Sequence, residues 1–125
     1  MKYALLIYEN AESFSSRDQV DDSEYFGAWR AYHRTMVDAG IYVDGDPLHA
    51  PETATTIRER DGKKHIQDGP YANTKEQLAG FIVLELPSLD AALEWASRCP
   101  ATARGAVEVR PLAPEQKRRT TCGDG

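Results

Sequence analysis

The sequence predicts a single α+β domain in which two helices cover one face of a β-sheet. Two short segments, 2–8 and 80–86, place apolar residues on both alternating faces, which is typical of strands covered on both sides. Two longer segments, 22–39 and 89–98, repeat apolar residues at three- and four-residue steps, as amphipathic helices do. The length of 125 residues suits one domain and leaves no room for two.

The first half of the domain begins with the strand 2–8 and continues through a polar segment, 10–20, that we interpret as a loop. The helix 22–39 follows; Asp and Ser residues at 21–23 are its N-cap candidates, and Gly40 ends it. The apolar stripe of this helix consists of Tyr25, Phe26, Trp29, Tyr32, His33, Met36 and Val37.

The middle of the chain contains a short strand and a hairpin. The strand begins at 41–43, and the sequence DGDP at 44–47 then predicts a turn or a bulge. Segments 53–60 and 63–67 flank Asp61-Gly62, a dipeptide that favours a two-residue type I′ hairpin. Because this hairpin is polar and highly charged, we expect it to lie at a sheet edge or to project from the sheet.

The second half resumes after a break at 68–71, where the sequence reads DGPY. The apolar strand 80–86 follows, and Ser88 is the expected N-cap of the helix 89–98. Pro100 ends this helix because proline cannot continue the hydrogen-bond ladder.

The last predicted strand, 106–110, alternates valines with charged residues. No apolar periodicity remains beyond it, so we predict a folded domain over 1–112 and a disordered tail over 113–125. Without the polar hairpin, the elements run β-α-β-β-α-β, which is the order of the ferredoxin-like fold.

The two strands that are apolar on both faces also predict a partner. Two helices cover only one face of such a sheet, so something else must cover the other face. In so short a chain, the cover that we expect is a second copy of the same sheet. The sequence therefore predicts a C2 homodimer of the dimeric α+β barrel type.

Composition excludes several classes of protein. A net charge of −5 argues against nucleic acid as the main partner, and no apolar run approaches the roughly 20 residues of a membrane span. The two cysteines, Cys99 and Cys122, show no framework spacing, which favours a reducing cytoplasm. The three histidines lack the spacing of a helical metal site, so we expect no metal and no other cofactor.

The most specific string is DGPYANTKEQLAGFIVLEL at 68–86. Together with the opening MKYALLIY and the closing LDAALEWASRCPATARGAVEVRPL, it resembles the YCII-related family, in its branch named for a DGPF motif. Here Tyr71 stands where that motif has Phe. The resemblance runs from Met1 to Leu112 and implies a ferredoxin-like dimer whose sheets face each other, but it assigns no reaction.

Some relatives in the wider family use a His–Asp pair in a small pocket. Their His lies on the first helix, and their Asp directly precedes a Pro after the second helix. The matching positions here are Trp29 and Cys99, and neither side chain can take the original role. His33 lies one turn beyond Trp29 and is the candidate substitute, because its near-neutral reference pKa suits proton transfer.

The catalytic candidates are His33 and Asp68, and each has a structural alternative. A histidine on an apolar stripe also serves as a hydrogen-bonded core residue, and an Asp before Gly-Pro is a common turn former whose carboxylate accepts backbone N–H groups. Held beside a pocket, the Asp68 carboxylate would instead be a general base. The residues that we expect to line a ligand pocket are Tyr8, Trp29, Tyr42, Lys75 and Glu76.

Two functions follow from these observations. The first is a non-catalytic module that binds a small ligand or a protein partner. Members of this branch are often encoded beside extracytoplasmic-function sigma factors, which implies a regulatory or accessory role linked to a sigma factor. The alternative is a cofactor-independent enzyme of the lyase, isomerase or dehydrohalogenase type, in which His33 or Asp68 moves a proton.

Overall fold

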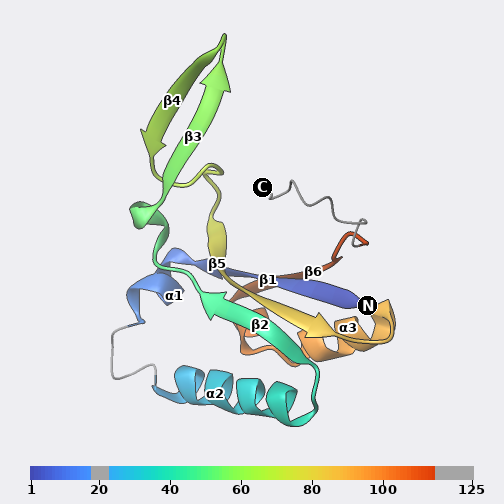
Figure 1. The fold of residues 1–125 in the computed structure, drawn as a ribbon. Helices are drawn as coiled ribbons and strands as arrows, with labels where there is room; N and C mark the ends of the chain where they lie inside the picture. The colour runs from blue at the N-terminus through green and yellow to red at the C-terminus, as the bar shows by residue number, and fades with distance from the viewer. Residues whose placement is uncertain (18–22, 115–125) are drawn as a thin grey trace.

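The structure, a computed structural model, describes residues 1–17 and 23–114. It contains a four-stranded antiparallel sheet with the strand order β2-β5-β1-β6 and a separate two-stranded sheet of β3 and β4 (Figure 1). The strands span Lys2–Asn10 (β1), Tyr42–Pro47 (β2), Thr55–Arg60 (β3), Lys63–Asp68 (β4), Glu76–Glu85 (β5) and Gly105–Pro111 (β6).

Two long helices, α2 (Ser23–Asp38) and α3 (Leu89–Ser97), lie on one side of the four-stranded sheet (Figure 1). A short helix, α1, spans Ala11–Ser15, and 3-10 turns span Pro51–Thr53 (η2) and Pro100–Ala103 (η3). The order of strands and long helices confirms the predicted ferredoxin-like α+β fold with an extra hairpin. No helix within the described ranges is long and apolar enough to cross a membrane.

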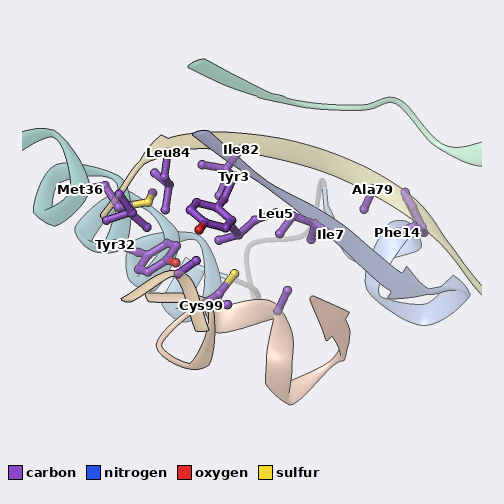
Figure 2. Packing of buried hydrophobic residues seen from close by; sticks show 14 residues of the cluster. Tyr3, Leu5, Ile7, Phe14, Tyr32, Met36, Ala79, Ile82, Leu84 and Cys99 are labelled. Atoms are coloured by element: carbon purple, nitrogen blue, oxygen red, sulfur yellow. The ribbon is translucent and has the colours of Figure 1, made fainter. Parts of the chain in front are cut away.

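The core lies between the sheet and these helices. Alternate residues of β1 point inward, and Leu5 of β1 and Leu84 of β5 are fully buried. Tyr32 and Met36 approach from α2, and Cys99 is buried just after α3 (Figure 2). The remaining buried apolar residues are Tyr3, Ile7, Phe14, Ala79, Ile82, Leu86, Ala92, Ala96 and Ala101.

Among the described residues, no helix lies over the opposite face of the sheet (Figure 1). Cross-strand partners share a face, and here Leu6 stands opposite Phe81 and Ala4 opposite Val83, all of them half-buried. This open face also carries Glu108, which accepts a hydrogen bond from the Tyr8 hydroxyl and lies beside Arg110.

The prediction of a loop over residues 10–20 was wrong for its first part, because residues 11–15 form α1. The Asn10 side chain accepts a hydrogen bond from the Ser13 backbone N–H at 2.8 Å, as an N-cap does. Phe14 is then buried against the sheet. A five-residue helix with one buried apolar side chain has no periodicity to detect, so its N-cap residue was the available sequence signal. Residues 18–20 lie outside the described ranges.

Strand boundaries differ where the strands become polar. β5 begins at Glu76, four residues earlier than predicted, because its first residues pair with the extended end of β1 at Tyr8, Glu9 and Asn10. The sequence predicts a turn or a bulge at 44–47, but these residues pair with β5 as part of β2, and the register shift lies just before them, between Tyr42 and Asp44.

The predicted hairpin is also confirmed, and it projects from the body. Asp61 and Gly62 have φ angles of 52° and 77°, as a type I′ turn requires. We call β3, β4 and their turn the arm; it rises on the side of the sheet opposite α2 and α3 (Figure 1). Of the predicted tail, residues 115–125 lie outside the described ranges.

Candidate functional site

A cavity of about 660 Å³ lies between α2 and the strands β2, β5 and β1. Its helical wall is aromatic, because Tyr25 and Phe26 lie four and three residues before Trp29 and all three line the cavity from α2. Apolar side chains of the core, Ile7 and Ile82 among them, form its floor. A pocket of this size, mainly apolar with a few polar groups, is typical of small-molecule sites.

The strand wall of the cavity depends on two glycines. Gly45 and Gly80 lie where β2 and β5 pair closely, and both line the cavity. A Cβ atom on Gly80 would lie 2.9 Å from the carbonyl oxygen of Asp46, and one on Gly45 would lie 2.7 Å from that of Phe81. Any larger residue at these positions would therefore push the strands apart or fill the space beside them.

A buried carboxylate lies at the end of the cavity nearest the start of α2. Glu9 continues the inward series of Tyr3, Leu5 and Ile7 along β1, and its exposed fraction is only 5%. The Tyr25 hydroxyl donates a hydrogen bond to Glu9 Oε2 at 2.5 Å. A carboxylate buried to this degree requires such partners, since desolvation of a charge is costly.

Arg17 supplies the positive charge beside this carboxylate. Its Nη2 lies 3.8 Å from Glu9 Oε1 and donates a hydrogen bond to the carbonyl oxygen of Ala79 at 3.3 Å. The same guanidinium donates to the carbonyl oxygen of Leu48 and lies over the Phe14 ring. Arg17 thus ties the end of α1 to both β5 and the segment after β2.

Tyr25 remains protonated over the physiological pH range. Burial, followed by the hydrogen bond to Glu9, raises the pKa of its hydroxyl well above the usual value. The Arg104 guanidinium lies 3.7 Å above the Tyr25 ring and holds it from the other side. Glu9, Tyr25 and Arg17 therefore form one polar cluster, which we call the Glu9 cluster.

The other end of the cavity carries His33 and Tyr42. Their rings meet edge to face, with centroids 4.7 Å apart. The Tyr42 hydroxyl donates to the carbonyl oxygen of Gly45 at 3.1 Å, and burial raises its pKa. The His33 side chain is exposed at the cavity rim, so it is accessible to a ligand rather than held in the core.

The structure brings together three of the seven residues singled out from the sequence. His33, Trp29 and Tyr42 line the cavity, whereas Tyr8 lies on the open face of the sheet. Lys75 and Glu76 are exposed where the chain enters β5.

Asp68 ends β4 at the base of the arm, away from the cavity lining. Within residues 1–17 and 23–114 its carboxylate accepts no hydrogen bond, whereas the adjacent Gly69 N–H bonds to the carbonyl oxygen of Ala54. The turn is thus held by the backbone rather than by the Asp68 side chain.

Trp29 and Cys99, which occupy the positions of the relatives' His–Asp pair, lie in different surroundings. Trp29 packs edge to face on Tyr32, with ring centroids 5.9 Å apart. Cys99 is 1% exposed in the core, and burial raises the pKa of its thiol to about 11. A thiol that stays protonated is a poor nucleophile and a poor metal ligand. Among the described residues, no three His, Cys, Asp or Glu side chains gather as a metal site would require.

Sequence reasoning missed the Glu9 cluster. Its available signal was the alternation of β1: a glutamate in the inward series that begins at Tyr3 is a buried charge and calls for a partner. Chemically, the cluster offers a carboxylate that accepts hydrogen bonds or a proton, next to a tyrosine hydroxyl and an aromatic wall. These groups suit the binding of a planar molecule with a hydroxyl group, or the removal of its proton.

Comparisons with known proteins agree with this fold. Residues 1–116 match the YCII-related domain. An uncharacterized protein of Rhizobium meliloti (strain 1021) is 37% identical over 117 residues, which cover 90% of this chain and 93% of that protein.

A solved structure is similar in fold. It is the 5-chloro-2-hydroxyhydroquinone dehydrochlorinase of Burkholderia phenoliruptrix AC1100 in complex with 2,5-dihydroxybenzoquinone, with a TM-score of 0.52 and 17% identity. The match covers 90% of this chain and 94% of that one, and at this identity it supports the fold alone. The family match and the Rhizobium relative together show that this chain belongs to the YCII-related domain family.

Proposed function

We propose that this domain binds a small planar organic molecule in the cavity beside α2 and works as a ligand-binding accessory module. The observation that carries the proposal is the cavity of about 660 Å³, which has an aromatic wall and ends on the buried Glu9 carboxylate. Apolar walls supply affinity, and a few fixed polar groups orient the ligand. Part of the DGPF-like branch is encoded beside sigma factors, so the module is proposed to act in the cytoplasm in a regulatory pathway.

A direct test is a thermal-shift screen of the purified chain against a metabolite library, repeated with Gly80→Val. The valine side chain would occupy the wall where β2 and β5 meet, so a ligand that stabilises the parent should leave the variant's melting temperature unchanged. Tyr8→Phe, on the open face, is the matched control and should keep the full shift. Ligands that stabilise both variants equally would place binding outside the cavity and defeat the proposal.

The second candidate function is proton transfer without a cofactor. The observation that favours it is the Glu9–Tyr25 hydrogen bond inside the cavity, with His33 at the opposite rim. The dehydrochlorinase of similar fold acts on a chlorinated hydroxyhydroquinone, and comparable chemistry in this chain would need a base beside a phenolic ring. Glu9 or His33 would take that proton, and Tyr25 would hold the ring oxygen.

This second function predicts turnover rather than binding alone. A ligand from the screen should be converted by the parent chain, and conversion should fall about 100-fold or more in Glu9→Gln if Glu9 is the base. His33→Gln separates the two candidate bases, because it should leave the rate of conversion unchanged when Glu9 removes the proton. A ligand that binds but is not converted would contradict the enzyme function and support the ligand-binding module.

We also propose that the open face packs against a second copy of the chain. Leu6, Phe81 and Val83 lie on this face, no helix of the described ranges covers them, and burying such a patch favours association. Sedimentation equilibrium should give a dimer, and Leu6→Glu should shift it to the monomer. A parent chain that is monomeric at micromolar concentration would contradict this assembly.

A further inference from the structure

We infer that the cavity takes a planar carboxylate that carries a hydroxyl group at its other end, such as a hydroxylated aromatic acid. This inference rests on the proposed binding function and specifies its ligand. It comes from the different polar groups at the two ends of the cavity: a carboxylate already paired with Arg17 at one end, and two arginines without an ion-pair partner among the described residues at the other.

Two arginines of α2 provide the positive end. Arg30 and Arg34 lie one helical turn apart and both line the cavity. A Cβ atom on Gly27 would lie 3.7 Å from Arg30 Nη2, so this guanidinium folds back along α2 over the preceding turn. Neither arginine forms an ion pair within the part of the chain that the structure describes. Two guanidinium groups beside an apolar cavity suit a carboxylate, which they bind through paired N–H groups.

The opposite end is the Glu9 cluster, where Arg17 is the countercharge of Glu9 and its guanidinium already donates to the carbonyl oxygens of Leu48 and Ala79. Glu9 is buried and already accepts the Tyr25 hydroxyl, yet a carboxylate has about four acceptor positions. One further hydrogen bond from a ligand hydroxyl is therefore accommodated. A ligand carboxylate at this end would face Glu9, while the Arg17 guanidinium beside it is already paired with Glu9 and bonded to two backbone carbonyl oxygens, so this end favours a hydroxyl donor.

The distance between the two ends sets the length of the ligand. Tyr25 marks the Glu9 cluster, and the backbone of Arg34 lies nine residues further along α2, about 13.5 Å at 1.5 Å per residue. The Arg30 guanidinium folds back toward Gly27, so it lies closer to the cluster than its own backbone does. Phe26 and Trp29 line the stretch between the two ends, so the body of the ligand is flat and apolar. One ring with a short conjugated acid chain meets these requirements.

The test uses three probes with the full chain in isothermal titration calorimetry. 4-Hydroxycinnamate has both polar groups, cinnamate lacks the hydroxyl, and 4-vinylphenol lacks the carboxylate. We expect 4-hydroxycinnamate to bind about tenfold or more tightly than either analogue, because each loses a hydrogen bond to a charged group. The preference over 4-vinylphenol should shrink as salt concentration rises.

Variants then assign each group to its end. The double variant Arg30→Gln, Arg34→Gln should lose the preference for probes with a carboxylate and keep the preference for probes with a hydroxyl. Tyr25→Phe or Glu9→Gln should lose the preference for the hydroxyl and keep the preference for the carboxylate. Arg58→Gln with Arg60→Gln, on the exposed arm, removes the same charge far from the cavity and should change neither preference.

Three results would overturn the inference. Equal binding of the three probes at the cavity would refute the ligand class and leave the proposed binding function standing. The ligand class would also be refuted if the library ligands that stabilise the parent but not Gly80→Val include no carboxylates. If the probes fail to bind and every library ligand stabilises Gly80→Val as well as the parent, the binding function fails with it.

Discussion

The sheet–helix body and the arm show two ways of holding antiparallel strands together. In the body, β1 pairs with β5 on one side and β6 on the other, and its inward side chains are covered by α2 and α3. In the arm, β3 pairs with β4 and with no other described strand, and the directly opposed Ile57 and Ile66 are 61% and 71% exposed. The inward face of the body's sheet is buried whereas the arm's isoleucines are exposed, so we expect burial to make the body the more stable of the two.

The largest contrast is expected for apolar truncation. Leu5→Ala removes a fully buried side chain from the centre of β1, and we expect it to cost about 2–5 kcal/mol of unfolding free energy. Ile57→Ala removes a similar side chain from the exposed arm and should cost less than about 0.5 kcal/mol. Urea denaturation of both variants measures this. An Ile57 variant as unstable as the Leu5 variant would show that the arm is covered in solution, as by a second copy.

The second contrast concerns alkaline pH. Burial raises the pKa of the Cys99 thiol to about 11, and burial is also the main reason that the pKa of Tyr25 and of Tyr32 is raised. A folded-state pKa above the unfolded one gives stability that is complete below the unfolded pKa and is lost as pH rises through the folded one. We therefore expect unfolding free energy to fall between about pH 9 and pH 11, by on the order of 2 kcal/mol from Cys99 alone.

Cys99→Ala provides the control for this pH dependence. Because alanine has no titrating group, the variant should lose stability less steeply over the same pH range, although it starts from a lower value. Denaturation curves of parent and variant at several pH values give the comparison. Parallel pH profiles for the two proteins would exclude Cys99 as a contributor.

Replacing a glycine in each region compares how closely the backbones pack in the body and in the arm. Gly80→Ala in the body would bring a Cβ atom within 2.9 Å of the Asp46 carbonyl oxygen, and we expect this overpacking to cost about 1–3 kcal/mol. Gly62→Ala in the arm meets no atom within 4 Å, but its φ of 77° is strained for alanine, at a cost of about 1 kcal/mol. Thermal melts should thus rank Gly80→Ala below Gly62→Ala. The reverse order would mean that β2 shifts freely to make room.

The smallest expected effects come from polar side chains at element ends. The Ser88 hydroxyl accepts the Ala91 N–H at the start of α3, so Ser88→Ala should cost about 1 kcal/mol. Asp68→Ala at the base of the arm should change stability by less than about 0.5 kcal/mol, because within the described ranges its carboxylate accepts no hydrogen bond. Chemical denaturation resolves the two values. A clearly destabilised Asp68 variant would restore the turn-forming role that the sequence predicts for it.

Much of the fold was predictable because the information is local. The alternation of 2–8 and 80–86, the helical stripes and the Asp61-Gly62 turn each depend on a few neighbouring residues, and all appear where expected. The position of Ser88 as an N-cap is similarly local. By contrast, α1 is short and carries one buried aromatic residue, so its existence depends on the sheet against which Phe14 packs.

The candidate site was only partly predictable, because proximity in space decides its membership. His33, Trp29 and Tyr42 were identified from the pattern and do meet at the cavity, whereas Tyr8 belongs to the other face of the sheet and Asp68 to the arm. Neither the polarity of these side chains nor their place in a motif says which of them meet in space.

The sequence by itself therefore determined the order of the strands and long helices, the ferredoxin-like arrangement and the alternation at the start of β1, which the structure continues to the carboxylate of Glu9. Only the tertiary structure decided that Tyr25 and Arg17 reach that carboxylate, that Gly45 and Gly80 leave space beside it, and that the arm carries Asp68 away. The physical reason is that a strand's alternation is set by neighbouring residues, whereas a buried charge is stabilised by groups that the chain brings back from other elements.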